Sequence, residues 1–446
     1  MSEKPRPTHA PGAQPSSEPE APRSRPAQAR PAAAGAAPAA DVHRLDCSGV
    51  PALLRRNPAH EVVAVRLYLR GGCTSVEPRH AGIELLYGRA ARRGTERFPK
   101  ERLNAAVARL GTEIATTAGE DHTLFHMRCL RRHLEASWKM FTDIVLHPLL
   151  AAPEVELVRR QMLHEIRQRR DDPDGRLGDV ARAHTFAGHP YAIHPAGTEE
   201  SVPALDAEAL RAHAGRRLVR RNLLLVVVGD LGADELAAMD AFAALPEGSA
   251  AAAPPPLRFS TSRLRVESSE LPTNYVLGHF AAPSLADAGH PAALLALSIL
   301  RDRLFEEVRT KRNLSYAPGA GLSPYAANVG WIYVTCVDPG STLPVMRDTM
   351  RELCDRPLEA KELHDRVRVF ITRYYLQNES NQAQAGFLAS YELLGGGWER
   401  SRDFVARLEA LTPEDVQGAA RAMLRHIQYA YLGDAAKADP ALFVDP

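Results

Sequence analysis

The chain has 446 residues, of which 45% are hydrophobic, and its formal net charge at pH 7 is +1. This length predicts two domains of ordinary size, and the hydrophobic fraction is typical of a globular protein with a buried core. The near-zero net charge gives no electrostatic basis for binding nucleic acid or an anionic membrane surface, so we expect neither as a partner.

Residues 1–41 consist mainly of Pro, Ala, Ser and Arg and contain almost no large apolar side chain. Such a segment cannot bury enough surface to offset the entropy lost on ordering, so we predict a disordered tail. A passive tail explains this composition more simply than a docking segment does.

The predicted N-terminal domain, residues 42–245, mixes strands with helices. An alternating, β-branched run at 61–69 predicts a strand that ends at a Gly-Gly pair. Leu223–Val228 is apolar at every position, which predicts a strand buried on both faces. Helices are predicted over 80–92, 100–110, 134–146 and 153–169, and a strand pair over 112–130.

Residues 246–257 form a predicted linker, because they are rich in Pro and Ala and carry no periodicity. The C-terminal domain, residues 258–440, repeats the pattern of the first. A helix start at 205–210 and a strand end at 229–230 recur at 411–416 and 433–434, at offsets of 206 and 204 residues. Several matches in one order predict a tandem duplication. The predicted fold class is α+β, with two homologous domains that each pack a mostly antiparallel sheet with helices.

One stretch of the second domain can bring a cation and a phenol together. Apolar residues recur at helical spacing from Pro291 to Val308, which places Arg309 in the last turn of a predicted helix. Asn313 is a predicted helix stop, and the next strand is predicted to begin at Tyr316. An arginine in a last turn also meets the helix dipole favourably, and a tyrosine at a strand start commonly serves packing. These residues alone therefore leave a functional and a structural role open.

Cysteine usage and hydropathy indicate the cellular compartment in which we expect the protein. The five cysteines are scattered and never form a C-x-x-C pair, which argues against a disulfide framework and against a thiolate zinc site. No apolar run approaches the roughly 18 residues that span a bilayer, and the N-terminus lacks the apolar core of a signal peptide. Free thiols fit a reducing compartment, so we expect a cytoplasmic protein.

Several short motifs recur in a fixed order along the chain, namely Gly71-Gly72, Arg93-Gly94-Thr95, Glu165-Ile166 before Asp171-Asp172-Pro173, Leu304–Arg309 with Leu314-Ser315-Tyr316, and Leu411–Asp415. In their order and spacing, they resemble those of the pitrilysin/insulinase-type metallopeptidases, in the branch of two-domain subunits that includes the mitochondrial processing peptidase. The resemblance covers about residues 42–436. This family binds peptides by strand addition to a sheet edge, and residues 112–117 correspond to that edge here.

The zinc site of this family is an H-x-x-E-H motif on the helix before the Gly-Thr pair, together with a glutamate on a later helix. The resemblance places the motif on Leu85, Gly88 and Arg89, and the later ligand on Glu165. Leucine and glycine offer zinc no lone pair, and arginine puts a fixed positive charge where the cation would lie. We therefore expect no cofactor on this chain, and predict that a buried Arg89–Glu165 salt bridge replaces the metal.

The other histidines supply no replacement for the missing ligands. Neither H-x-x-E-H nor H-E-x-x-H occurs among the 17 histidines. His122 and His126 share one face of a predicted strand, but no third ligand lies at a suitable spacing. We interpret them as surface or hydrogen-bonded imidazoles.

The resemblance implies that Arg309 and Tyr316 bind the substrate backbone and stabilise the oxyanion formed during peptide hydrolysis. In some bacterial members, the zinc motif and the Arg/Tyr pair lie on separate chains. We therefore predict a non-zinc subunit of a heterodimeric metallopeptidase, inactive alone, whose homologous partner carries the zinc and whose substrate is a peptide. The alternative is a catalytically inactive structural or peptide-binding scaffold.

Overall fold

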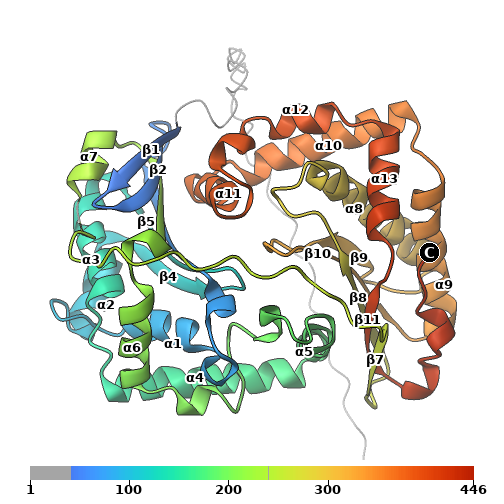
Figure 1. The fold of residues 1–446 in the computed structure, drawn as a ribbon, viewed down its shortest axis with the longest axis horizontal. Helices are drawn as coiled ribbons and strands as arrows, with labels where there is room; N and C mark the ends of the chain where they lie inside the picture. The colour runs from blue at the N-terminus through green and yellow to red at the C-terminus, as the bar shows by residue number, and fades with distance from the viewer. Residues whose placement is uncertain (1–41, 240) are drawn as a thin grey trace, which may run out of the picture. The chain divides into compact units, whose positions relative to one another are not determined.

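Two β-sheets, one in each half of the chain, organise residues 42–239 and 241–446, which are the residues that the computed structural model describes (Figure 1). The segment predicted to be disordered, residues 1–41, lies outside the described residues. The first sheet contains β1 (Val42–Cys47), β2 (Val50–Arg56), β3 (Val62–Arg70), β4 (Glu113–Ala118), β5 (His122–Leu130) and β6 (Leu223–Gly229). The second contains β7 (Leu264–Ser268), β8 (Asn274–Ala281), β9 (Gly319–Leu322), β10 (Val329–Cys336) and β11 (Gln428–Gly433).

The two sheets have the same connectivity over five strands. In the order β1-β2-β6-β3-β5-β4, strand β6 pairs parallel with β2 and antiparallel with β3, and β3, β5 and β4 continue antiparallel. In the order β7-β11-β8-β10-β9, strand β11 takes the place of β6, and β8, β10 and β9 take the places of β3, β5 and β4. The predicted α+β class with two homologous, mostly antiparallel halves is confirmed.

Helices follow the strands in a similar order in both halves. The first half has α1 (Ile83–Ala91), α2 (Lys100–Leu110), α3 (Leu134–Leu146), α4 (Ala152–Asp171), α5 (Pro173–Thr185), α6 (Ala207–Arg217) and α7 (Ala233–Ala238). The second has α8 (His290–Leu304), a π-helical turn (Phe305–Thr310), α9 (Pro339–Asp355), α10 (Ala360–Gln377), α11 (Asn381–Leu394), α12 (Phe404–Glu409) and α13 (Pro413–Met423). No helix in the described ranges is both long and apolar enough to cross a bilayer.

Most predicted helices have their expected bounds, and the exceptions have local causes. The helix predicted over 80–92 begins only at Ile83, because Gly82 adopts a left-handed conformation with φ of 89° after a short 3-10 turn. The helix predicted over 153–169 continues to Asp171, and a new helix starts at once. Its start is capped by Asp172, whose side chain accepts a hydrogen bond of 2.8 Å from the Gly175 amide.

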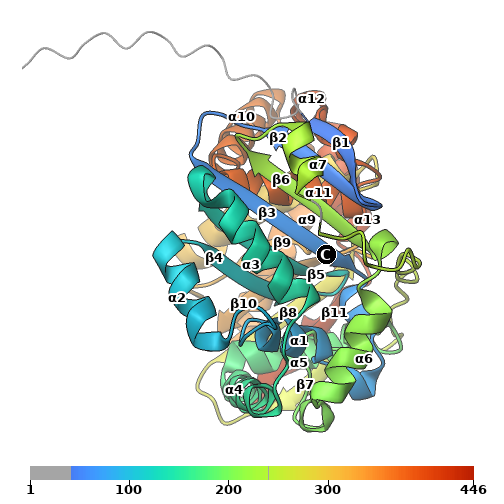
Figure 2. The ribbon, with the colours of Figure 1, turned by 90° about the vertical axis from the view of Figure 1, so that its left-hand side faces the viewer.

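The core of the first half lies between one face of its sheet and α1, α3 and α4. Alternate residues of β3 reach this core, among them Val63, Val65 and Leu67, and meet Leu86 of α1 and Phe141 of α3. In Figure 2, which looks onto the first half, α3 lies in front of the sheet. The other residues of β3 point to the opposite face of the sheet, which faces the second half of the chain.

Each half of the chain contributes one helix that packs on the sheet of the other half (Figure 1). Helix α11 packs on β3 and β6, where Leu388 joins a cluster with Tyr68 and Val226. Helix α5 packs on β8 and β11, where Leu177 joins Leu432. The two halves are therefore joined through two packed cores, and not only through residues 246–257, which contain neither helix nor strand.

Candidate functional site

Helix α1 lies along the edge strand β4, and Gly88 lies directly against this strand. Among the strands that the structure describes, β4 pairs only with β5, so its other edge is free of any described strand. A Cβ built on Gly88 would lie 2.8 Å from the Cβ of Thr116 and closer still to its Cγ2. Position 88 therefore accepts no side chain unless β4 moves, which leaves no space for the carboxylate that the zinc motif places there. The sequence did not point to Thr116, because this contact depends on how α1 meets β4.

Arg89, one residue further along α1, forms the expected ion pair with Glu165 of α4. The Arg89 Nη1 lies 2.9 Å from Oε1 and 2.7 Å from Oε2 of Glu165. The expectation that this pair is buried is wrong, since the two side chains are 32% and 50% exposed. The buried residues of α4 are Val155, Val158, Met162 and Ile166, so Glu165 lies beside this apolar stripe and not within it.

These residues do not fit a zinc ion. Leu85 packs against the core, Gly88 offers no donor atom, and the Arg89 guanidinium already occupies both oxygens of Glu165. Within residues 42–239 and 241–446, no three His, Cys, Asp or Glu side chains are arranged to hold a metal ion.

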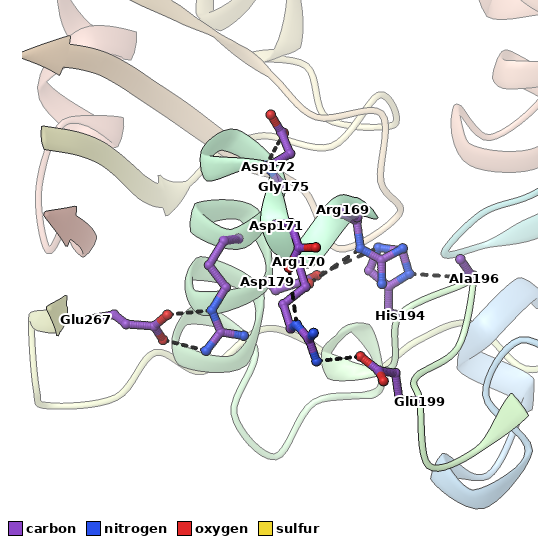
Figure 3. Close-up of polar contacts among 11 residues, drawn as sticks. Arg169, Arg170, Asp171, Asp172, Gly175, Asp179, His194, Ala196, Glu199 and Glu267 are labelled. Atoms are coloured by element: carbon purple, nitrogen blue, oxygen red, sulfur yellow. Dashed lines mark hydrogen bonds and ion pairs between the residues drawn. The ribbon is translucent and has the colours of Figure 1, made fainter. Parts of the chain in front are cut away.

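A network of polar contacts fixes the end of α4 that follows Glu165 (Figure 3). Arg170 Nη1 donates to Glu199 at 2.7 Å, and Arg169 Nε donates to Asp179 at 3.4 Å. The contacts tie α4 to α5 and to the loop around Glu199. They hold the bend at Asp172, and hence the direction of the helix that carries Glu165.

His194 belongs to this network as a neutral group (Figure 3). Burial lowers the pKa of His194 to about 3, and the positive charges of Arg169 and Arg182 add to the effect. The amide of Ala196 donates to His194 Nδ1 at 3.0 Å, so the ring proton lies on Nε2. With no other imidazole beside it in the network, His194 serves packing and hydrogen bonding.

The second candidate region starts where α8 continues into a π-helical turn. Arg309 lies in this turn, which ends at Thr310, and Asn313 follows with a left-handed φ of 51°. The predicted helix stop at Asn313 is confirmed. The structure also brings Arg309 and Tyr316 together, because Arg309 Nη1 donates to the Tyr316 carbonyl oxygen at 3.3 Å. The Arg309 guanidinium carbon lies 4.8 Å from the ring centre of Phe305 and 5.7 Å from that of Tyr316.

Tyr316 points away from the protein. Its side chain is 74% exposed, and its hydroxyl makes no hydrogen bond to any of the described residues. The prediction that a strand begins at Tyr316 is wrong, because β9 begins at Gly319, directly after Pro318. Proline has no amide hydrogen to donate to a neighbouring strand, so Tyr316 lies in the preceding bend. The phenol is thereby presented to solvent beside a fixed cation.

Two family models match the chain. The model described as Insulinase (Peptidase family M16) matches residues 52–199, and the model described as Peptidase M16 inactive domain matches residues 204–369. The chain is similar to an uncharacterized zinc protease of Mycobacterium leprae, with 30% identity over 54% of this chain and 57% of that protein. It is also similar to one of Streptomyces coelicolor, with 25% identity over 74% of this chain and 76% of that protein. The first match thus spans little more than half of its relative.

Solved structures share the fold. A peptidase M16 inactive domain from Pseudomonas fluorescens aligns with a TM-score of 0.82 and 22% identity, over 88% of this chain and 98% of that chain. A protease from Helicobacter pylori aligns with a TM-score of 0.79 and 16% identity, over the same shares. A chain of Complex III2 from Candida albicans aligns with a TM-score of 0.76 and 18% identity, over 88% of this chain and 96% of that chain.

Proposed function

This chain belongs to the M16, or insulinase-type, peptidase family, and we propose that it is the non-zinc subunit of a heterodimeric member. A homologous partner subunit holds the zinc, and this chain adds Arg309 and Tyr316 to the shared site for peptide hydrolysis. The observation that carries the proposal is the exposed Tyr316 phenol held beside Arg309.

The pair has the chemistry that peptide hydrolysis requires of a second subunit. Negative charge develops on the carbonyl oxygen of the peptide bond as it is attacked, and a positioned hydroxyl donor stabilises this charge. The Tyr316 hydroxyl is free to act as that donor, because no described residue accepts its hydrogen. Arg309 uses one nitrogen to hold the Tyr316 carbonyl, which leaves other N–H groups for a backbone carbonyl of the peptide.

The first half of the chain supports a role that depends on a partner. The positions of the two histidines and of the general base are taken by Leu85, Gly88 and Arg89, and Thr116 fills the space above Gly88. Catalysis therefore needs a metal and a base from another chain. Strand β4 retains the free edge through which the family binds an extended peptide.

The test is co-expression with a homologous chain that carries H-x-x-E-H, followed by a peptide-cleavage assay. We expect Tyr316→Phe to lower kcat by about 10²- to 10³-fold with little change in KM, as for loss of an oxyanion donor. Tyr375→Phe, on the exposed surface of α10, is the matched control and should leave kcat unchanged. Wild-type activity of the heterodimer that carries Tyr316→Phe would overturn the role of the phenol. Stoichiometric zinc in the isolated chain would overturn the assignment of the zinc to the partner subunit.

A catalytically inactive scaffold is the second candidate. The fold likeness to a chain of Complex III2 favours it, since that protein uses the same fold within a large assembly. In this case the co-purified pair binds peptide or assembles with its partner without cleaving peptide bonds, and Tyr316→Phe has no effect on either property.

A further inference from the structure

Strand β7 is an edge strand of the second sheet, whereas the equivalent edge of the first sheet is covered. In the first sheet, β2 pairs parallel with β6 on one side and antiparallel with β1 on the other. Its counterpart β7 pairs parallel with β11, and no strand of the described residues takes the place of β1 (Figure 1). The second sheet is therefore one strand short at this edge, where β7 presents unpaired backbone groups.

The hydrogen bonds to β11 determine which residues of β7 face the open edge. The Tyr429 amide donates to the Arg263 carbonyl oxygen at 2.7 Å, at the start of the parallel pairing. Alternate residues of a parallel pair direct both backbone groups to the neighbouring strand, so those of Arg265 and Glu267 face β11. The Ser262 hydroxyl donates to one outward carbonyl at 3.4 Å. The residues whose backbone groups face outward are Leu264, Val266 and Ser268.

The side chains of β7 place opposite charges two residues apart on one face of the strand. Arg265 and Glu267 share the face that lies against α5, where Arg176 donates to both oxygens of Glu267 (Figure 3). Arg265 is exposed, and it forms no ion pair or hydrogen bond with any residue of the described ranges. One charge of this face is therefore paired within the chain and the other is not.

The remaining charged groups nearby line a hollow of about 390 Å³ between α5 and β7, which Arg265 also lines. Its carboxylates are already paired, since Glu267 contacts α5 as described and Asp179 accepts from Arg169 at 3.4 Å. Burial lowers the pKa of His184, so this imidazole adds no charge at neutral pH. Arg265 is thus the cation of the hollow that lacks a carboxylate.

We propose that two copies of this chain pair through their β7 strands, antiparallel about a two-fold axis at Val266. The outward backbone groups of the two strands then form hydrogen bonds across the axis. The same register places Arg265 opposite the Glu267 of the second copy, twice by symmetry, at the positions where opposed side chains lie closest. The Glu267 carboxylate has lone pairs left beside its contacts with Arg176, so it can accept from both arginines.

Charge also selects this register over its neighbours. A shift by two residues, which keeps the outward groups paired, would oppose either Arg265 or Glu267 to its own copy, and like charges directly opposite are destabilising. The surface is separate from that of Arg309 and Tyr316, because β7 and β9 are opposite edges of the sheet and Tyr316 precedes β9. The inference therefore does not depend on the proposed function.

The test is sedimentation equilibrium of the full chain without other subunits. We expect reversible association from 48.7 kDa to twice this mass at micromolar concentrations. Val266→Pro removes the amide donor at the axis and should weaken the dimer about 10-fold or more. Because this amide faces outward, no hydrogen bond within the chain is lost. Arg368→Glu is the control, since this arginine is exposed on α10 and has no ion-pair partner among the described residues.

Two complementary variants then test the register. The first is Arg265→Glu. The second combines Glu267→Arg with Arg176→Glu, which keeps the ion pair between α5 and β7 with its charges reversed. Each variant alone opposes like charges at both symmetric positions and should dimerise on the order of 10-fold more weakly. An equimolar mixture opposes unlike charges at both positions and should recover the affinity of wild type.

Urea unfolding checks that each variant folds, and the charge variants test the same surface should Val266→Pro fail to fold. A wild-type chain that stays monomeric up to its solubility limit would overturn the proposal. A dimer that Val266→Pro and both charge variants leave unchanged would overturn it as well, because the copies would then meet elsewhere. A mixture that associates no more tightly than its components would overturn the pairing of Arg265 with Glu267.

Discussion

Arg309 Nη1 donates to the backbone carbonyl of Tyr316 at 3.3 Å, and the same guanidinium lies 4.8 Å from the ring centre of Phe305. The cation thus fixes the course of the chain after the π-helical turn without contacting the Tyr316 hydroxyl. Arg309 therefore fixes where the Tyr316 phenol lies, but it does not engage the phenol hydroxyl. Mutations at Arg309 and at Tyr316 can thus change the position of the phenol and its capacity to donate a hydrogen bond separately.

Tyr316→Phe is expected to change the free energy of unfolding by no more than about 0.5 kcal/mol, because the side chain is exposed and its hydroxyl has no partner among the described residues. Arg309→Gln should cost up to about 1 kcal/mol through the lost cation–π contact at an exposed site. Urea unfolding measures both. A loss of roughly 2 kcal/mol or more in Tyr316→Phe would mean that the tyrosine serves packing.

The Arg89–Glu165 pair should contribute little to stability. Because both side chains are partly exposed, a double-mutant cycle with Arg89→Gln and Glu165→Gln should give a coupling energy of about 0.2–1 kcal/mol. The exposed pair of Lys139 and Glu135 on α3 provides a cycle of comparable size for reference. A coupling of several kcal/mol would show that the pair is shielded from solvent.

Gly88→Ala should destabilise the protein by about 1–3 kcal/mol, since the added methyl group must displace Thr116. Thr116→Ala in the same chain should recover part of this loss by removing the nearer methyl group. Gly178→Ala in α5 is the matched control, because a Cβ there meets no described atom within 4 Å. It should be neutral or stabilising by up to about 1 kcal/mol, as expected for a helical glycine. Equal effects at the two glycines would contradict the close contact of α1 and β4.

Helices α5 and α11, which each pack on the sheet of the other half, should each be essential for stability. Leu177→Ala in α5 and Leu388→Ala in α11 remove buried side chains and should each cost about 2–5 kcal/mol in chemical denaturation. Leu376→Ala on α10 removes a side chain that is 60% exposed, and a change within about 0.5 kcal/mol is expected. Small effects at Leu177 or Leu388 would mean that the helix concerned is not firmly packed on the opposite sheet.

Stability should fall in mild acid through His279, which joins β8 to α5 by a 2.9 Å hydrogen bond between its Nδ1 and the Thr185 hydroxyl. Burial lowers the pKa of His279 to about 4, and the charges of Arg182 and His184 lower it further. Between about pH 6.5 and pH 4, His279 therefore binds a proton in the unfolded chain but not in the folded chain. This contribution is fully present above about pH 6.5 and is lost as the pH falls toward 4, by roughly 3 kcal/mol at most.

The measurement is urea unfolding of wild type and His279→Gln at pH 7 and pH 5. The variant should lose stability at pH 7, and the difference in unfolding free energy between the two pH values should be smaller than in wild type. His364→Gln, on the exposed side of α10, should keep the pH dependence of wild type. An unchanged pH dependence in His279→Gln would rule out a contribution from this histidine.

Local patterns predicted most of the elements of this fold. The helices at 100–110 and 134–146 have the bounds that apolar periodicity gave them, and the repeat of the strand ends at Gly229 and Gly433 reflects the equivalent strands β6 and β11. Periodicity succeeds here because these helices and strands bury one regular face in the core of their own half.

Tertiary contacts account for what the sequence could not predict. Apolar spacing in α4 does not distinguish a glutamate on the buried stripe from one beside it, so the sequence predicts a buried Arg89–Glu165 pair where the structure has a partly exposed one. The contact of Gly88 with Thr116 depends on how α1 meets β4. Near Arg309 and Tyr316, Pro318 prevents strand pairing, so β9 begins only at Gly319. Alternation of polar and apolar residues does not reveal this effect.

Because α5 and α11 each pack on the sheet of the opposite half, the two halves of the chain cannot be separated without loss of a covering helix. Each helix is encoded beside one sheet and buried against the other, so neither half of the coding sequence specifies a sheet covered on both faces. A half expressed alone would expose an apolar strand surface, which is a typical cause of aggregation. The duplicated copies are thus no longer interchangeable modules, and any recombination that separates them must also supply the missing helix.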